Sequence, residues 1–183
     1  MRQLKHHEKK LLKKVDFFSW KSERNVREAT IIRKYLLQDR EDYIKYSKLV
    51  GRITKLCAKL KQLDQSNSTR ITLSEQLLLK LFNMGIVNKT SSLTEIENLA
   101  VSAFCRRRLP VVMVRLKMSE NLKEATTFIE QGHVRVGPNV ITDPAFLVTR
   151  TFEDYVTWVD SSKIKRTIMR YNDKLDDFDL LGN

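Results

Sequence analysis

The residues of this sequence best suited to chemistry are its lysines and arginines, which gather in two blocks. Residues 1–62 hold 18 Lys/Arg against 7 Asp/Glu, and residues 106–118 hold 5 basic residues and no acidic one, in a chain of net charge +12. Clustered ammonium and guanidinium groups neutralise phosphates, whereas an even spread would only serve solubility. Membrane lipid is the rival polyanion, but the basic segments lack the Trp/Phe-rich apolar faces of lipid-lying helices. The pattern favours nucleic acid as the partner.

Residues that could catalyse a reaction or hold a metal are sparse. Cys57 and Cys105 form no CxxC motif, and the three histidines have no ligand spacing relative to them. The chain has 5 glycines and no glycine-rich phosphate loop, and we find no plausible catalytic triad. The acidic run at residues 173–179 reads as a solvated tail. We therefore expect no enzyme activity, no cofactor and no small-molecule substrate, with both cysteines buried as small hydrophobic residues in a reducing compartment.

Targeting signals are equally scarce. No apolar run is long enough to span a bilayer, so we expect no membrane partner. The basic N-terminus lacks the apolar core and cleavage site of a secretory signal.

The first basic block leads into a long amphipathic helix, predicted over residues 40–63. Its apolar residues recur at alternating spacings of three and four, and three leucines widen the stripe. The predicted buried positions are Tyr43, Tyr46, Val50, Ile53, Cys57 and Leu60, with Leu49, Leu56 and Leu63 beside them. The opposite face carries Lys45, Lys48, Arg52, Lys55, Lys59 and Lys61. Lysine-rich faces are often merely solvated, but no acid occurs between Lys45 and Lys61, which favours contact with nucleic acid.

The segments on either side of this helix are expected to be helical in part. Residues 1–20 read as a basic arm with Leu4, Leu11, Leu12, Val15 and Phe18 on one side, docked through Phe17 and Trp20. After the long helix, Thr72 with Glu75 matches a capping box, which predicts a helix that closes at Gly85. Ser92 with Glu95 repeats that pattern. The nearly neutral region 63–105 is thus expected to be structural.

The second basic block opens two helices and a hairpin. Pro110 requires that a helix begin near residues 107–110. Leu109, Val112, Met113 and Leu116 are expected to point inward, and Arg107, Arg108, Arg115 and Lys117 outward. Asn121 and Glu124 mark a second helix with Leu122, Ala125, Phe128 and Ile129 buried, closed by a left-handed Gly132. Residues 133–136 alternate as a strand, 137–139 turn, 140–141 return, and 155–159 offer a later strand.

The segments RRLPVVMVRL and GHVRVGPNVITDP together resemble the S4-type RNA-binding domain, over about 43 residues. The resemblance implies an α+β fold in which two helices pack on a small β-sheet and present a basic groove to structured RNA. The matching positions are Arg107, Arg108, Arg115, Lys117, His133 and Arg135, beside the neighbouring Arg106. One departure matters: where the family commonly opens the second helix with an arginine, this chain has Leu122, preceded by Glu120. That part of the surface is expected to lack a phosphate contact.

A wider resemblance covers most of the chain. The segments KHHEKKLLKKVDF, REDY and DYVTWVDSSKIKRTIMRYNDKLDDFD are similar to S4-like proteins of the U3 small nucleolar ribonucleoprotein. That family implies U3 RNA, pre-ribosomal RNA and a large acidic scaffold phosphoprotein as partners, a nucleolar location, and a role in pairing the two RNAs for 18S ribosomal RNA processing. A protein adaptor or a structural ribosomal protein of the small subunit remains the alternative.

The expected organisation has four parts. They are a basic arm at 1–39, a helical region at 40–105, the S4-type domain at 106–160, and a C-terminal helix with an acidic tail at 161–183.

Overall fold

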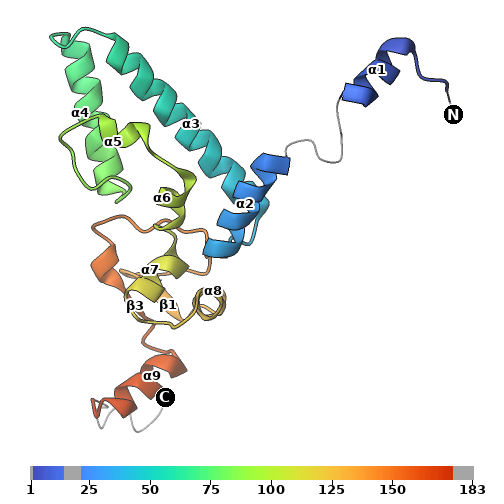
Figure 1. The fold of residues 1–183 in the computed structure, drawn as a ribbon. Helices are drawn as coiled ribbons and strands as arrows, with labels where there is room; N and C mark the ends of the chain where they lie inside the picture. The colour runs from blue at the N-terminus through green and yellow to red at the C-terminus, as the bar shows by residue number, and fades with distance from the viewer. Residues whose placement is uncertain (1, 15–21, 175–183) are drawn as a thin grey trace.

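The computed structural model describes residues 2–14 and 22–174, and its folded part joins a bundle of helices to a small α+β domain (Figure 1). The N-terminal arm contains α1 (His6–Lys14) and α2 (Ser22–Tyr35). The helical region contains α3 (Arg40–Gln62), α4 (Ser68–Asn83), α5 (Thr94–Glu97) and α6 (Val101–Cys105). The domain that follows contains α7 (Leu109–Arg115), α8 (Leu122–Glu130), β1 (Val134–Val136), β2 (Asn139–Val140), the 3-10 helix η1 (Glu153–Tyr155) and β3 (Val156–Trp158). The helix α9 (Lys163–Tyr171) comes last.

The long helix α3 is confirmed to within a residue of its predicted bounds. Tyr46, Cys57 and Leu60 are buried on it as expected, because α2, α4, α5 and α6 all pack against this side. The predicted widening of the stripe is wrong: Leu49, Leu56 and Leu63 are 40%, 43% and 40% exposed. These leucines lie about 70–110° around the helix from the centre of the stripe, toward its solvent-exposed side.

Two predicted helix caps are also wrong. Helix α4 begins at Ser68, where the side chain of Asn67 accepts a hydrogen bond from the Thr69 amide, so Thr72 lies inside the helix and donates its hydroxyl to the Ser68 carbonyl. The asparagine cap is available one turn earlier and satisfies the free amides there. Helix α5 is capped by Leu93 rather than by Ser92. The predicted end of α4 is confirmed, since Gly85 has a φ of +71°.

The domain after α6 follows the predicted order of two helices and three strands. Its antiparallel sheet has the strand order β2-β1-β3, with Arg135 opposite both Val140 and Thr157. Helices α7 and α8 pack against each other and against the sheet around a core that includes Val112, Met113 and Ile129. Gly132 has the expected left-handed φ of +73°. Leu116, predicted to point inward, is 38% exposed because α7 ends before it.

The two cysteines are confirmed as buried residues. Cys57 and Cys105 have no exposed surface, are not disulfide-bonded, and lie in separate apolar clusters of the helical region. Burial raises the pKa of the Cys105 thiol to about 11, which leaves it protonated at neutral pH.

The two ends of the chain contribute less to the core. The N-terminal arm, expected to be helical in part over residues 1–20, contains α1 within that range. It also contains α2, which was not predicted and which packs on α3. Helix α9 has no buried residue and extends from the far side of the sheet domain (Figure 1). The predicted contacts of Val15, Phe17, Phe18 and Trp20, and the acidic tail from residue 175 onward, lie outside the described residues.

Candidate nucleic-acid interface

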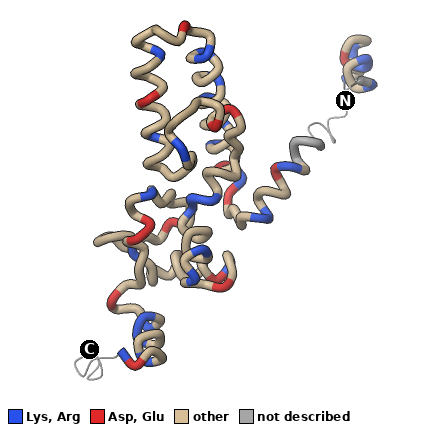
Figure 2. The backbone as a smooth tube through the Cα atoms, turned by 60° about the vertical axis from the view of Figure 1, so that its left-hand side comes forward, with Lys and Arg blue, Asp and Glu red and all other residues tan. Residues whose placement is uncertain are grey.

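The basic face of α3 forms one continuous stripe, defined by Lys45, Lys48, Arg52, Lys55 and Lys59. All five residues are exposed. At 100° per residue they fall within an arc of about 80°, almost opposite the buried Tyr46 and Cys57, and they extend over about 21 Å of helix. Figure 2 shows the basic positions along this helix. The tertiary contacts of the buried side thus turn the α3 stripe toward solvent.

Few acidic side chains among the described residues form ion pairs with the α3 stripe. Lys45 lies 3.4 Å from the Asp42 carboxylate, but the other four stripe residues make no ion pair with any residue that the structure describes. Exposed, unpaired cations can exchange water and counterions for phosphate without first breaking an internal contact.

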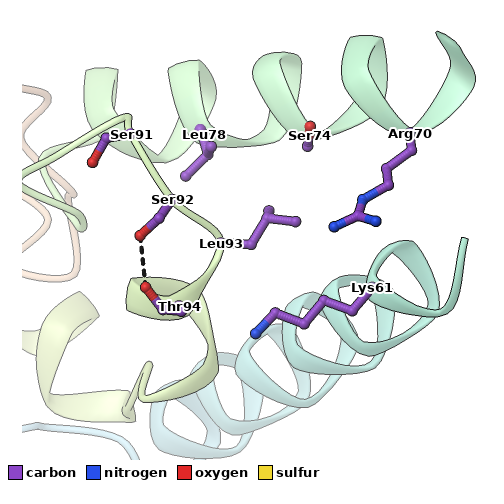
Figure 3. A pocket seen from close by; sticks show the side chains of 8 residues that line it. All are labelled: Lys61, Arg70, Ser74, Leu78, Ser91, Ser92, Leu93 and Thr94. Carbon is purple, nitrogen blue, oxygen red and sulfur yellow. Dashed lines mark hydrogen bonds between the residues drawn. The ribbon is translucent and has the colours of Figure 1, made fainter. Parts of the chain in front are cut away.

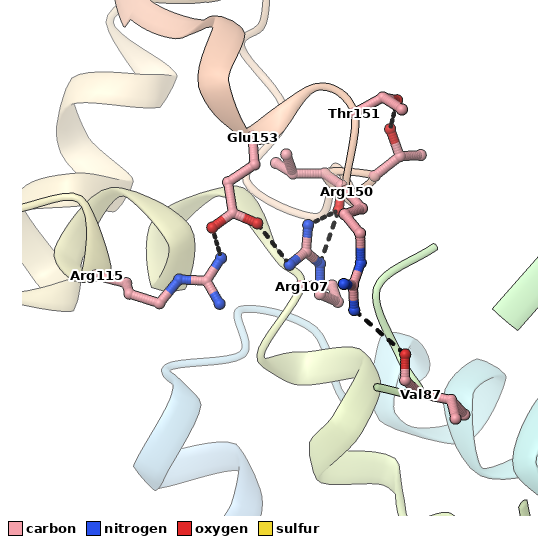
Figure 4. A network of polar contacts seen from close by, with 8 residues as sticks. Val87, Arg107, Arg115, Arg150, Thr151 and Glu153 are labelled. Carbon is pink, nitrogen blue, oxygen red and sulfur yellow. Dashed lines mark hydrogen bonds and ion pairs between the residues drawn. The ribbon is translucent and has the colours of Figure 1, made fainter. Parts of the chain in front are cut away.

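Arg107, which the sequence predicted to point outward, is buried in the structure. Its Nε and Nη2 atoms donate to the Val148 carbonyl oxygen at 2.9 and 2.7 Å, and Nη1 donates to Glu153 Oε2 at 2.9 Å (Figure 4). The guanidinium is covered because the backbone of residue 107 also pairs with the 147–148 segment. Arg107 therefore ties the connection between α6 and α7 to the segment that runs from Val148 to Glu153.

Arg108 was also predicted to point outward, but its side chain is buried and the residue is 1% exposed. Its Nη1 atom donates to Asp42 Oδ2 at 2.9 Å and lies 3.4 Å from the Tyr46 hydroxyl. Residue 108 is the extended N-cap of α7, and its side chain reaches across to α3. A buried charge needs a compensating partner, and Asp42 provides it. Arg108 therefore fixes the base of α3 against α7.

The remaining basic residues of the second block are exposed to solvent, but they differ in how many intramolecular contacts they make. Arg106 is exposed and its Nε lies 3.4 Å from the Tyr35 hydroxyl. Arg115 is about half exposed and pairs with Glu153. Lys117, exposed at the end of α7 with a φ of +60°, has no ion-pair partner among the described residues. This side of the domain therefore presents fewer available charges than its sequence suggests.

Glu153 is the interacting residue that the sequence analysis missed. Burial alone would raise the pKa of its carboxyl, but the hydrogen bonds and charges of Arg107 and Arg115 outweigh burial and hold this pKa below its ordinary value. The acid lies 38 and 46 residues from its partners, so no local spacing could have revealed it. The only sequence signal is an acidic residue in the turn before β3.

Arg135 lies on β1, the central strand of the sheet, and His133 directly precedes that strand, beside the segment that leads to α9. Nδ1 of His133 is 3.0 Å from the hydroxyl of the buried Ser162, which caps α9. Arg135 donates from Nε to the Thr157 hydroxyl at 3.0 Å and forms an ion pair with Asp160. A hydrogen bond from Lys165, followed by the charge of Arg135, keeps the pKa of Asp160 below its ordinary value. Both predicted site residues are thus engaged in intramolecular contacts.

These surfaces can bind a polyanion by charge and shape. The α3 stripe and the exposed cations near α7 are joined through the buried Arg108–Asp42 pair, so both are attached to one framework. Among the residues that the structure describes, no cluster of His, Cys, Asp and Glu is suited to hold a metal ion. In the same part of the chain, no helix is long and apolar enough to cross a membrane.

Comparison with known proteins divides the chain at the second basic block. Residues 3–106 match the ribosomal protein S4/S9 N-terminal domain, and residues 107–153 match the S4 domain. The chain is 54% identical to the U3 small nucleolar ribonucleoprotein protein IMP3 of Saccharomyces cerevisiae and 50% identical to that of Homo sapiens, in each case over 98% of both chains. It is 28% identical to the small ribosomal subunit protein uS4 of Methanothermobacter thermautotrophicus, over 88% of this chain and 95% of that protein. These relatives are named as ribonucleoprotein and ribosomal proteins, not as enzymes.

Proposed function

This chain belongs to the IMP3 family of U3 small nucleolar ribonucleoprotein proteins, and from that premise we propose that it is a non-enzymatic RNA-binding protein that helps U3 RNA pair with pre-ribosomal RNA. In this proposal it acts in the nucleolus, within the particle that processes 18S ribosomal RNA, and also contacts a large acidic scaffold phosphoprotein. The observation that carries the proposal is the α3 stripe, with four cations free of ion pairs among the described residues.

The mechanism follows from electrostatics and geometry. Phosphates that meet the α3 stripe release their counterions, which favours binding without base recognition. Arg106, Arg115 and Lys117 provide a second surface next to α7, and the Arg108–Asp42 pair keeps the two surfaces from moving independently. Two RNA segments held on one small protein have a raised effective concentration, so a short duplex forms faster. Double-stranded RNA would be recognised by shape and backbone.

The site residues divide into two roles in this proposal. Lys45, Lys48, Arg52, Lys55 and Lys59 contact phosphates, together with Arg106, Arg115 and Lys117. Arg107 and Arg108 support these surfaces from the interior. Arg135 and His133 join the contact only where RNA competes with Asp160 and Ser162.

An annealing assay with purified full-length protein tests the proposal. Two labelled strands, one with the U3 sequence and one with its pre-ribosomal complement, are mixed with and without protein. We expect the wild type to accelerate pairing, and Lys55→Gln with Lys59→Gln to weaken RNA binding and lower the slope of log affinity against log salt by about 1.4–1.8. Lys80→Gln with Lys89→Gln removes the same charge from exposed positions outside the stripe and is expected to change the slope little.

Two results would count against this function. Equal effects of the two double variants would mean that only net charge matters. Tight RNA binding without faster pairing would favour the second candidate, a protein adaptor. That candidate is supported by α9, where Ile168 and Tyr171 are 39% and 89% exposed on the apolar side of the helix.

A further inference from the structure

A cavity of about 330 Å³ lies at the far end of the helical region, away from the sheet domain. It is bounded by the last turn of α3, the first turns of α4 and the segment 91–94 (Figure 3). The apolar side of the cavity is formed by Leu78, which is buried, and Leu93, which is partly buried. Its volume falls within the range of small-molecule sites, about 300–1,000 Å³.

Two cations from different helices point into this space. Arg70 donates from Nη1 to the Leu63 carbonyl oxygen at 2.7 Å, which orients the guanidinium and leaves its other N–H groups without a partner among the described residues. Lys61 lies 2.6 Å from the Glu97 carboxylate and keeps two further N–H donors. Glu97 thus pairs with Lys61, whereas Arg70 forms no ion pair among the described residues and interacts with the Asp64 charge only at longer range. Figure 3 shows Arg70 directed toward Leu93, and Lys61 extending below Leu93 toward Thr94.

Hydroxyl groups line the other end of the cavity. The Ser92 and Thr94 hydroxyl oxygens are 2.6 Å apart, and Ser91 beside them is exposed. A hydroxyl both donates and accepts hydrogen bonds, so this end suits sugar hydroxyls as well as the polar edge of a base. The cavity therefore offers an apolar surface, a fork of positive donors and a group of hydroxyls side by side.

We propose that this cavity binds a single unpaired nucleotide of an RNA chain. The base lies against Leu78 and Leu93, the phosphate meets Arg70 and Lys61, and the ribose faces Ser92 and Thr94. Guanidinium groups bind phosphate through two parallel hydrogen bonds, and unpaired nucleotides can insert where a duplex cannot. The inference rests on the proposed RNA-binding function and adds to it a third contact, specific for single strands, in a region of nearly neutral charge. A free nucleoside monophosphate has the same chemistry and is the alternative source.

The test uses the full-length protein with two probes, a 12-nucleotide oligo(U) RNA and 5′-UMP. Arg70→Gln removes the phosphate fork, and Ser91→Phe fills the cavity without a change of charge. We expect each to weaken oligo(U) binding roughly three- to tenfold, while binding of a blunt RNA duplex of equal length changes less than about twofold. Lys80→Gln removes one exposed charge from the same helix as Arg70, outside the cavity, and serves as the matched control. Unchanged thermal unfolding midpoints show that the variants fold.

The outcomes separate this inference from the general function. If Arg70→Gln and Ser91→Phe bind oligo(U) as the wild type does, while the α3 stripe variant loses affinity, the cavity proposal is wrong and RNA binding stands. If Arg70→Gln weakens the duplex and the single strand equally, the residue acts only by charge, and the cavity proposal is again wrong. If the wild type binds neither RNA, both proposals fail. Saturable 5′-UMP binding lost in Ser91→Phe, with oligo(U) unaffected, would assign the cavity to free nucleotides instead.

Discussion

Replacing the buried Arg108 tests whether a charge pair in the interior holds α3 to the rest of the protein. Arg108→Met keeps much of the aliphatic length but leaves the Asp42 carboxylate, whose side chain is 13% exposed, without its main partner. Removing one member of a buried ion pair costs about 3–5 kcal/mol. Because Lys45 lies 3.4 Å from the same carboxylate and offsets part of this cost, we expect a loss of about 3 kcal/mol. For a chain of this size that corresponds to a melting temperature about 6–12 °C lower.

The assay is chemical denaturation followed by circular dichroism, with a double-mutant cycle. Arg108→Met, Asp42→Asn and their combination are compared with the wild type, and the double variant is expected to be more stable than the sum of the single losses predicts. Arg115→Met is the control, since its pair with Glu153 is about half exposed and should contribute at most about 1 kcal/mol. The reasoning would be refuted if Arg108→Met cost no more than Arg115→Met, or if the two single losses simply added.

Four further predictions concern acid titration, thiol reactivity and backbone geometry. The depressed pKa of Glu153 means that its stabilisation is complete above the ordinary glutamate value of 4.5 and is lost as pH falls through the lower folded value. Glu153→Gln should therefore flatten the loss of stability below about pH 4.5 in acid titrations. Cys105, with a pKa of about 11, should resist iodoacetamide at pH 8 until the protein is unfolded, as mass spectrometry would detect. Gly51→Ala, in open space within α3, should stabilise by about 0.5–1 kcal/mol. Gly85→Ala should destabilise by about 2 kcal/mol or more, because it strains a positive φ and meets a guanidinium 2.7 Å away.

A specific experimental result would contradict each of these predictions. Parallel acid curves for Glu153→Gln and the wild type would remove the role assigned to that carboxylate. Rapid labelling of Cys105 in the native protein would show that its region opens readily. Equal melting temperatures for the two glycine variants would mean that the local backbone geometry does not govern their stability.

Local signals predicted most of the elements that carry the interface. The spacing of apolar residues on α3 located the helix and its exposed basic side, and Pro110, Asn121 and Gly132 marked the bounds of α7 and α8. These features depend on one segment at a time, namely helical periodicity, the missing amide of proline and the tolerance of glycine for positive φ.

Contacts between segments that are distant in the sequence determined which side chains are buried and which residues cap the helices. The sequence contains a capping pattern at Thr72, but the N-cap of α4 is Asn67, and a helix has only one N-cap residue. Leu49, Leu56 and Leu63 stayed exposed because burial depends on where neighbouring helices lie, which the periodicity of one helix does not contain.

The basic residues show which features the sequence determines and which depend on the tertiary structure. By itself the sequence determined that two basic blocks exist and that α3 presents part of the first, because these follow from residue type and local periodicity. Its resemblance to the S4 domain located the second block. Only the tertiary structure decided which cations remain available. Arg107 pairs with Glu153 and Arg108 pairs with Asp42, acids that lie 46 and 66 residues away in the sequence. A buried charge requires a partner of opposite charge, and only the folded chain brings these partners together.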